Sequence, residues 1–378
     1  MSEPDFPESE FVGRVERTQT LMHEQALDAL LFTTEAELRY FTGFRTLFWQ
    51  SPTRPWFLVL PKSGKPIAVI PQIGAHLMGA TWIEDIRTFS APHPMDEGVS
   101  LLADTLIGFS RVGLPMGRES SLRMPLQDFE ALKSRLSNIE FLDASPLVQQ
   151  VRQIKSEAEI AAIRDICSIA SKSFANAKSL FKEGQTLKEA FRAFKIDLLQ
   201  NGADDVPYLV GGAGQGGYGD VISPPSGQPL QIGDALMLDT GAVKNGYFCD
   251  FDRNFAIGQA SDTVKTAHRK LVQAVDAAAD IARPGKTCAD LFHAMAEVLG
   301  QSDGDVGRLG HGLGMQLTET PSITDFDQTI LREQMVMTIE PSIGLGDGKM
   351  MVHEENIVIR DGAPEFLSAR AAPDIQVI

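Results

Sequence analysis

The chain has 378 residues, a formal net charge of -16 and a hydrophobic content of 43%, which predicts one very large domain or two domains with a sizeable core. It has no uninterrupted run of about 18 apolar residues, so we expect no membrane span, and its acidic balance argues against a nucleic-acid-binding protein. An acidic, polar N-terminus unlike a signal or transit peptide, and three scattered cysteines, favour the reducing cytoplasm.

The first part of the chain, up to about residue 145, predicts an α/β domain. Apolar spacing and turn residues give expected helices at 12–25 and 96–109, a short helix beginning with a capping box at Thr34, and strands at 29–32, 56–60, 67–70 and 111–114. The strands at 56–60 and 67–70 are expected to form a hairpin. Nothing in this part resembles a catalytic constellation.

A boundary is predicted within residues 146–157, which divides the chain into 1–148 and 149–378. Beyond it, two Ser/Thr-x-x-Glu patterns predict capped helices, one over 157–181 and one ending near Gly202. Residues 211–217 are so rich in glycine that we expect neither helix nor strand there, but a hinge or substrate loop or a plain surface loop. Two more helices are expected at 261–282 and 287–299.

The stretch 235–258 predicts a β-hairpin on which the rest of the site is organised. Asn245-Gly246 lies between two strand-like runs, and both turn residues accept a positive φ. With these two residues as the loop, Val243 lies opposite Phe248 and Asp239 lies opposite Asp252.

Asp239, Asp250 and Asp252 then share one face of the hairpin, because side chains alternate with a period of two. We expect Gly241, having no side chain, to leave space beside Asp250. Buried carboxylates are costly unless they are paired or bind a metal, and the alternative is a solvated acidic face.

Three further pieces carry candidate ligands. His311 lies in a glycine-rich loop, Glu340 ends an apolar strand, and Glu354 and Glu355 interrupt another. Carboxylate and imidazole ligands suit Mn²⁺, Zn²⁺, Co²⁺ or Fe²⁺, and four carboxylates with one histidine suggest two ions that share bridging groups.

The order Asp, Asp eleven residues on, Gly-His-Gly, Ile-Glu-Pro and His-Glu resembles peptidase family M24, the pita-bread metallopeptidases, which include Xaa-Pro aminopeptidase, prolidase and methionine aminopeptidase, with creatinase as a metal-free relative. The resemblance implies an α+β fold: a smaller creatinase-type N-terminal domain (1–148) followed by a pita-bread catalytic domain (149–378). Residues 38–44 are the most typical stretch of the former.

Carried over by position, the resemblance makes Asp239, Asp250, His311, Glu340 and Glu354 the metal ligands. Asp250 and Glu354 would bridge two divalent ions, and Glu355 is the competing choice for the second bridge. The resemblance further implies that metal-bound hydroxide attacks an amide carbonyl, with His311 and Glu340 as the catalytic residues and Glu340 helping to move the proton. It also implies a homodimer and manganese among the candidate metals.

The chain departs from the family pattern on the substrate side. Two histidines that usually contact the substrate are replaced by Ile222 and Thr318, and Asp252 stands where the family usually has threonine. Losing one oxyanion donor typically costs about 10²–10³ in rate. Two readings therefore stay open: an Xaa-Pro aminopeptidase or dipeptidase, and a non-peptidase member that hydrolyses or lyses a C–N bond of a small molecule. A third, non-enzymatic binding module is disfavoured by the intact ligand set.

The expected partners are a small peptide or small-molecule amide and a second copy of the chain, with no nucleic acid and no membrane. The candidate substrate-contacting residues are Tyr208, Ile222, Thr318, Asp252, Arg54 and Trp56. Arg54 and Trp56, together with Phe48 and Trp49, are candidates for completing a partner's pocket, and a buried aromatic cluster is the alternative for them.

Overall fold

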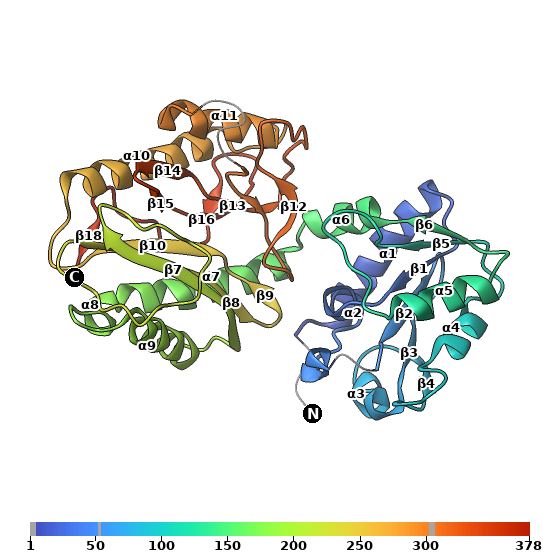
Figure 1. The fold of residues 1–378 in the computed structure, drawn as a ribbon. Helices are drawn as coiled ribbons and strands as arrows, with labels where there is room; N and C mark the ends of the chain where they lie inside the picture. Colours follow the sequence, from blue (N-terminus) through green and yellow to red (C-terminus); the bar gives the residue numbers. More distant parts are fainter. Residues whose placement is uncertain (1–4, 52–53, 302–306) are drawn as a thin grey trace. The chain divides into compact units, whose positions relative to one another are not determined.

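The computed structural model describes residues 5–51, 54–301 and 307–378, and the chain forms two compact units that divide between Arg152 and Gln153 (Figure 1). None of the helices in these described ranges has the length and apolar character needed to cross a bilayer.

The N-terminal unit is built on one mixed six-stranded sheet of order β4-β3-β2-β1-β5-β6. Its strands are β1 (Ala29–Phe32), β2 (Phe57–Pro61), β3 (Ile67–Pro71), β4 (Asp85–Phe89), β5 (Arg111–Leu114) and β6 (Glu140–Asp143). Its helices are α1 (Glu8–Glu24), α2 (Glu35–Thr42), α3 (Ala75–Met78), α4 (Val99–Leu106), α5 (Leu126–Arg135) and α6 (Ser145–Gln153), with 3₁₀ turns at Leu47–Gln50 and Gln72–Gly74.

The expected elements of this unit are largely confirmed. β1 and β5 have the predicted bounds, and β2 and β3 form the predicted antiparallel hairpin with Phe57 opposite Val69. One detail is wrong: Thr34 is the N-cap of α2, but its side chain makes no capping hydrogen bond. Helix α4 is shorter than expected because it begins at Val99, after Gly98 in a left-handed conformation.

The C-terminal unit contains two larger sheets and a separate hairpin of β14 and β15. One sheet has the order β18-β10-β8-β7, with β9 also paired to β8, and the other has the order β12-β11-β13-β16-β17. The strands are β7 (Asp205–Gln215), β8 (Asp234–Lys244), β9 (Tyr247–Phe248), β10 (Phe251–Ala256), β11 (His311–Gly312), β12 (Glu319–Ser322), β13 (Val336–Ile339), β14 (Ser342–Gly346), β15 (Lys349–Val352), β16 (Glu355–Val358), β17 (Glu365–Phe366) and β18 (Gln376–Val377).

The helices of this unit follow the capping signals of the sequence. They are α7 (Glu157–Ala175), α8 (Ala177–Leu180), α9 (Leu187–Gln200), α10 (Asp262–Ile281) and α11 (Cys288–Leu299). Both predicted capping boxes, at Ser156 and at Thr186, are present. The first predicted helix is interrupted near Asn176, where α7 ends and the short α8 begins.

The prediction of a loop at residues 211–217 is wrong, because most of this segment belongs to strand β7, which pairs along its length with β8. Glycine serves close packing here. A Cβ on Gly211 would lie 2.1 Å from the carbonyl oxygen of Met237, and one on Gly212 would lie 2.7 Å from the carbonyl oxygen of Asp220. Glycine in a strand often marks such a close backbone approach.

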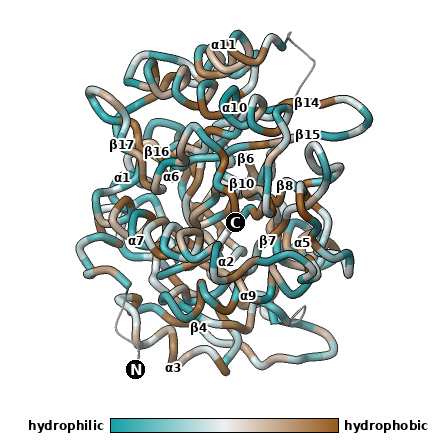
Figure 2. The backbone as a smooth tube through the Cα atoms, turned by 90° about the vertical axis from the view of Figure 1, so that its left-hand side faces the viewer, coloured by the Kyte–Doolittle hydropathy of each residue, from teal (hydrophilic) through white to brown (hydrophobic). Residues whose placement is uncertain are grey.

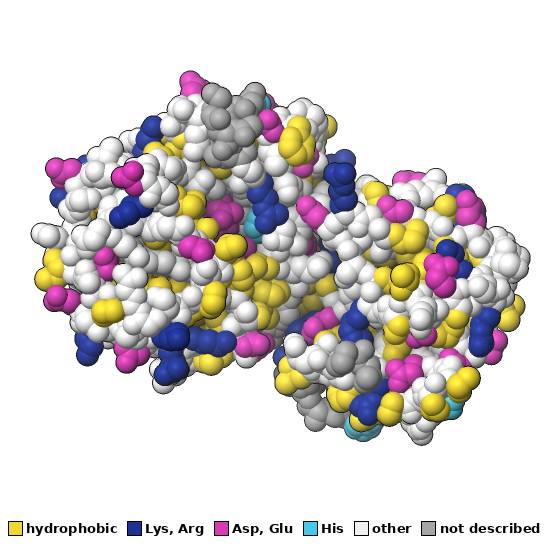
Figure 3. All heavy atoms as spheres, viewed as in Figure 1, with side chains coloured by type: hydrophobic (Ala, Val, Ile, Leu, Met, Phe, Trp, Pro, Cys, Tyr) yellow, Lys and Arg dark blue, Asp and Glu magenta, His cyan; other side chains and the backbone are white. Residues whose placement is uncertain are grey.

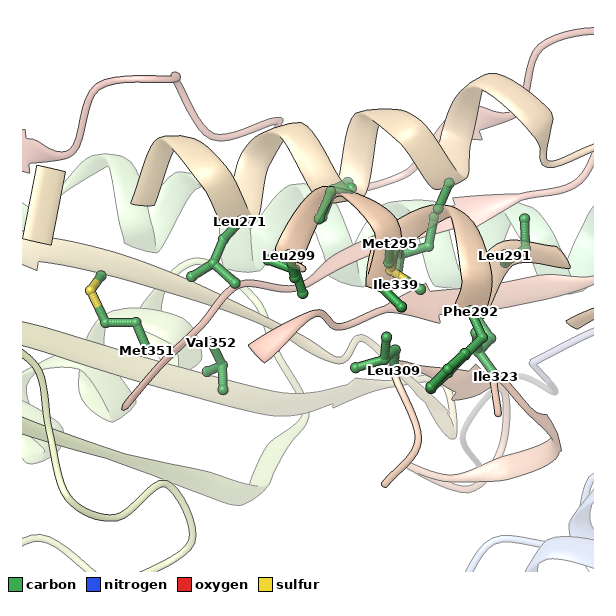
Figure 4. Packing of buried hydrophobic residues seen from close by; sticks show 14 of the residues in the cluster. Leu271, Leu291, Phe292, Met295, Leu299, Leu309, Ile323, Ile339, Met351 and Val352 are labelled. Atoms are coloured by element: carbon green, nitrogen blue, oxygen red, sulfur yellow. The ribbon is translucent and has the colours of Figure 1, made fainter. Parts of the chain in front are cut away.

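One hydrophobic cluster joins helices α10 and α11 to the two larger sheets. Its members include Leu271 of α10 and Phe292 of α11, as well as Met237, Ile339 and Ile357 of strands β8, β13 and β16. Figure 4 shows these helical side chains directed toward residues of the strands and loops below them. Figure 2 shows hydrophobic and hydrophilic residues alternating along the helices, as expected for elements with one buried face. The cluster thus anchors the strands whose ends carry the candidate ligands.

Candidate metal centre

The hairpin of β8 to β10 places two of the acids. Asn245 and Gly246 have φ values of 50° and 80°, and Val243 pairs with Phe248 as predicted. Asp239 is the cross-strand partner of Asp252, which confirms the predicted register. The face that carries Asp239 is continuous with the hydrophobic cluster through Ala235 and Met237, so this carboxylate lies at the edge of the core and is buried.

Asp250 lies between β9 and β10, and a side chain from another sheet holds its main chain. Oδ1 of Asn356 accepts a hydrogen bond from the Asp250 N–H at 3.0 Å, and the Asn356 amide donates to the Asp250 carbonyl. Asn356 lies in β16, two residues after Glu354. This pair of hydrogen bonds therefore joins the hairpin to the segment that carries Glu354.

His311 begins β11, after Gly310, whose φ is 135°. A Cβ on Gly310 would lie 2.3 Å from the Thr338 carbonyl oxygen, so only glycine lets the loop lie this close to β13. The His311 N–H donates to Thr338 Oγ1 at 3.1 Å, and Nδ1 lies 2.9 Å from the Gly312 carbonyl oxygen. That contact directs Nε2 toward Asp250, whose Oδ2 is 3.5 Å away.

Three side chains offer ligand atoms close enough to hold one ion. Atoms of Asp250, His311 and Glu354 all lie within 4.8 Å of one another, and all three side chains are buried. Asp239 and Glu340 belong to the same electrostatic cluster, since each raises the pKa of neighbouring acids in it. Glu340 follows β13, and its N–H donates to the Leu309 carbonyl oxygen at 2.9 Å.

Without a cation the cluster is electrostatically unfavourable. Burial, followed by repulsion from neighbouring carboxylates, raises the pKa of Asp239, Asp250 and Glu354 well above the ordinary range. Burial and the nearby Asp252 raise the pKa of Glu340 to about 7. Burial, and then the nearby Arg308, lower the pKa of His311 to about 4, so this imidazole is neutral at pH 7.

The donor set fits divalent metal. Among the described residues, Asp239 Oδ1, Asp252 Oδ2 and Glu354 Oε1 are buried and accept no hydrogen bond. Buried polar atoms in native proteins are nearly always satisfied, and an ion is one way to satisfy them. Several carboxylates with one neutral histidine form a hard, oxygen-rich ligand set suited to a metal such as Mn²⁺.

Glu354 and Glu355 have different surroundings. Glu354 lies in the break between β15 and β16, with one oxygen unsatisfied. Glu355 is engaged on both oxygens: Oε2 receives Arg253 Nη2 at 2.8 Å and the Ser368 hydroxyl, and Oε1 accepts from the Ala371 N–H at 2.9 Å. Although burial opposes it, the Arg253 charge lowers the pKa of Glu355 to about 2. Glu355 is thus a buried ion-pair partner.

The residues predicted to contact the substrate lie in different environments. Tyr208 of β7 lies across from Gly241, and its side chain hydrogen-bonds to Asp239. Burial, and then the Asp239 charge, raise the pKa of Tyr208. A Cβ on Gly241 would lie 2.3 Å from a methyl carbon of Leu317, so Leu317 and Tyr208 fill the space that was expected beside Asp250.

Thr318 is partly buried, and its Oγ1 accepts from Arg308 Nη2 at 3.3 Å. Ile222 lies in a loop with 76% of its surface exposed. In the N-terminal unit, Trp56 is 1% exposed, with its ring centroid 5.2 Å from that of Phe44 and 5.9 Å from that of Trp49. The Arg54 guanidinium lies 4.8 Å from the ring centroid of Phe48.

Sequence reasoning missed two residues that shape the centre. Arg308 influences Asp250, His311 and Glu340 electrostatically, yet it belongs to none of the motifs. Asn356 was overlooked although an asparagine inside an apolar strand is itself a signal of a buried hydrogen-bond role. In Figure 3, acidic and histidine atoms lie together on the surface of the C-terminal unit, next to Lys or Arg atoms and hydrophobic side chains.

Comparisons with known proteins agree with this arrangement. Residues 161–361 match the model of metallopeptidase family M24, and residues 14–154 match the creatinase/prolidase N-terminal domain. The chain is 26% identical to a putative dipeptidase, YkvY, of Bacillus subtilis over 93% of this chain and 96% of that one. It is 25% identical to an Xaa-Pro dipeptidase of Pyrococcus horikoshii over 93% of this chain and 95% of the other.

Two solved structures show the same fold. Dipeptidase PepE from Mycobacterium ulcerans superimposes with a TM-score of 0.85 and 24% identity, over 98% of this chain and 99% of that chain. The prolidase from Pyrococcus horikoshii gives a TM-score of 0.83 and 23% identity, over 96% of this chain and 100% of that chain.

Proposed function

Because this chain belongs to metallopeptidase family M24, we propose that it is a hydrolase that uses two divalent metal ions to cleave short peptides of the Xaa-Pro dipeptide class. The observation that carries the proposal is the convergence of Asp250, His311 and Glu354, with unsatisfied carboxylate oxygens beside them. The names of the relatives in B. subtilis and P. horikoshii supply the substrate class.

The proposed ligands are Asp239, Asp250, His311, Glu340 and Glu354, with Asp250 and Glu354 shared between the ions. Ions bound there would make a water nucleophilic near neutral pH and would polarise an amide carbonyl. The surroundings of Glu355 support Glu354 as the shared ligand, because Glu355 already serves Arg253 and Ser368.

The side chains around the ions would transfer the proton, bind metal and hold the substrate. Glu340 is partly buried, and its carboxylate would take the proton released by the water and pass it to the departing amine. His311 keeps its neutral form through burial and Arg308, so Nε2 has a lone pair to offer. Thr318 stands at the position where the family usually has a histidine, and Arg308 hydrogen-bonds to it. The Arg308 guanidinium would hold an anionic oxygen of the substrate.

The alternative is that the chain cleaves a C–N bond of a small non-peptide molecule, either by hydrolysis or as a lyase. It rests on the replacement of the two usual substrate histidines by Ile222 and Thr318. The Ile222 side chain is exposed to solvent. Arg308, which hydrogen-bonds to Thr318, supplies a polar donor. A peptide carbonyl therefore still has a candidate polar partner, which supports the peptidase proposal over the alternative.

Manganese, a homodimer and a cytoplasmic location stay predictions, as do pocket contributions from Phe48, Trp49, Arg54 and Trp56 of a partner.

A panel of dipeptides, with and without C-terminal proline, tests the proposal on protein loaded with Mn²⁺. We expect hydrolysis that disappears on chelation and returns with metal. If the loaded protein leaves every peptide intact while it hydrolyses small amides, the alternative replaces the proposal. Asp262→Asn is a matched control, since it removes one exposed acid from the start of α10, away from the proposed ligands.

A further inference from the structure

Asp252 lies on the same face of the hairpin as the proposed ligands. It is two residues beyond Asp250 and is the direct cross-strand partner of Asp239. Side chains two apart on a strand share a face, and the Cβ atoms of directly opposed residues lie about 4.5–5.5 Å apart. A carboxylate at position 252 is thereby brought beside that of Asp239.

The Asp252 side chain is buried away from water, yet one of its carboxylate oxygens has no hydrogen-bond donor. The residue is 1% exposed, and its Oδ2 accepts no hydrogen bond from any described residue. The facing Asp239 also has one unsatisfied oxygen, Oδ1. Two facing carboxylates, each with an empty buried oxygen, form an arrangement that a shared cation would satisfy and that two anions alone would not.

The other oxygen of Asp252 is held in place. His353 Nδ1 lies 3.3 Å from Asp252 Oδ1, and His353 Nε2 lies 3.4 Å from Glu355 Oε1. Glu355 in turn pairs with Arg253. Acidic and basic side chains therefore alternate along one buried chain of contacts, Asp252–His353–Glu355–Arg253. Such outer partners fix the orientation of metal ligands, and this chain leaves Oδ2 as the oxygen available for an ion.

We propose that Asp252 is a sixth protein ligand of the metal centre, binding through Oδ2 the ion that Asp239 also holds, with His353 fixing its orientation through Oδ1. The proposal rests on the metal centre proposed above. The competing account is that Asp252 serves only as the buried partner of His353. A fifth carboxylate on the centre makes the ligand set harder, so it favours Mn²⁺ over Zn²⁺ relative to a centre without it.

Calorimetric titration of metal-free protein with Mn²⁺ separates the two accounts. The compared proteins are wild type, Asp252→Asn, His353→Gln and the surface control Asp262→Asn. Loss of an outer partner typically weakens metal binding about 10–100-fold, so we expect a loss of that order in His353→Gln, a larger one in Asp252→Asn for one of the two ions, and none in the control. A Zn²⁺ titration should show a smaller loss in Asp252→Asn than the Mn²⁺ titration.

Equal weakening in Asp252→Asn and His353→Gln, or wild-type affinity in Asp252→Asn, would overturn the proposal. If Asp252→Asn does not fold, a crystal structure of the Mn²⁺-loaded wild type decides: a distance from Asp252 Oδ2 to an ion within about 2.0–2.6 Å, the usual range for oxygen ligands of divalent ions, supports it, and a longer one contradicts it. Failure of the wider proposal looks different, because wild type would then bind no Mn²⁺ at all.

Discussion

Asn356 holds the main chain of Asp250 from both sides: Asn356 Oδ1 accepts from the Asp250 N–H at 3.0 Å, and the Asn356 amide donates to the Asp250 carbonyl. The two residues are 106 positions apart in the chain. This contact, together with the hydrogen bond from Arg253 of the hairpin to the Glu354 carbonyl oxygen, joins the hairpin of one sheet to the strand break that carries Glu354.

Replacing Asn356 with alanine should therefore loosen the metal centre. We expect metal affinity to fall about 10–100-fold, as for other residues that orient ligands, and stability to fall by about 1–3 kcal/mol for each buried polar group left without a partner. Calorimetric Mn²⁺ binding and chemical denaturation measure the two effects. The exposed Asn138→Ala variant should change neither, and unchanged metal affinity in Asn356→Ala would show that the contact does not position Asp250.

Glutamine substitutions at residues 354 and 355 should fail in different ways. Glu354→Gln removes a proposed shared ligand, so we expect loss of metal and of activity in a protein that still folds. Glu355→Gln removes one partner of a buried ion pair, which typically costs about 3–5 kcal/mol, so we expect a lowered melting temperature with metal still bound at low temperature. Elemental analysis and thermal unfolding distinguish the two, and the reverse pattern would move the ligand by one residue.

The stability of the metal-free protein should depend on the protonation of Glu340. Its folded-state pKa is raised to about 7 from an ordinary 4.5. The folded state therefore binds more protons than the unfolded state between these values, and this contribution to stability is lost as pH rises through that window. We expect Glu340→Gln to become more stable relative to wild type as pH increases from 5 to 8 in the presence of a chelator. A difference in unfolding free energy that is constant with pH would contradict this.

Arg308 should contribute to substrate binding. Its side chain hydrogen-bonds to Thr318 and lies near two members of the acidic cluster, Asp250 and Glu340. A hydrogen bond to a charged group contributes about 1.5–3 kcal/mol, so Arg308→Ala should lower kcat/KM on a cleaved dipeptide by about 10–100-fold. Metal content should stay unchanged. The exposed Arg332→Ala variant is the control, and wild-type kinetics in Arg308→Ala would remove this residue from the substrate side.

Most features that depend on neighbours in the chain could be predicted from the sequence, although the capping box expected at Thr34 is not formed. Asn245-Gly246 specified the turn and with it the register that pairs Asp239 with Asp252, and the residues at 156 and 186 specified where two helices begin. The pita-bread catalytic fold and the creatinase-type N-terminal domain, predicted from the order of the motifs, are confirmed by the family and structural matches.

Features that depend on distant partners could not be predicted in this way. The glycines of β7 were interpreted as loop residues because the carbonyl oxygens that require them belong to β8 and to residue 220. Arg308 and Asn356 have partners that only the folded chain brings near. Glu354 and Glu355 are both acids in one apolar stretch, and their roles separate only when Arg253 and Ser368 are seen to occupy Glu355.

The metal content of the purified protein tests the central claim most directly. After incubation with Mn²⁺ and removal of excess metal, elemental analysis should find about two ions per chain in wild type, lost together on chelation, and fewer than one in the Asp250→Ala, His311→Ala double variant. Full metal occupancy in the double variant, or no bound metal in correctly folded wild type, would contradict the account.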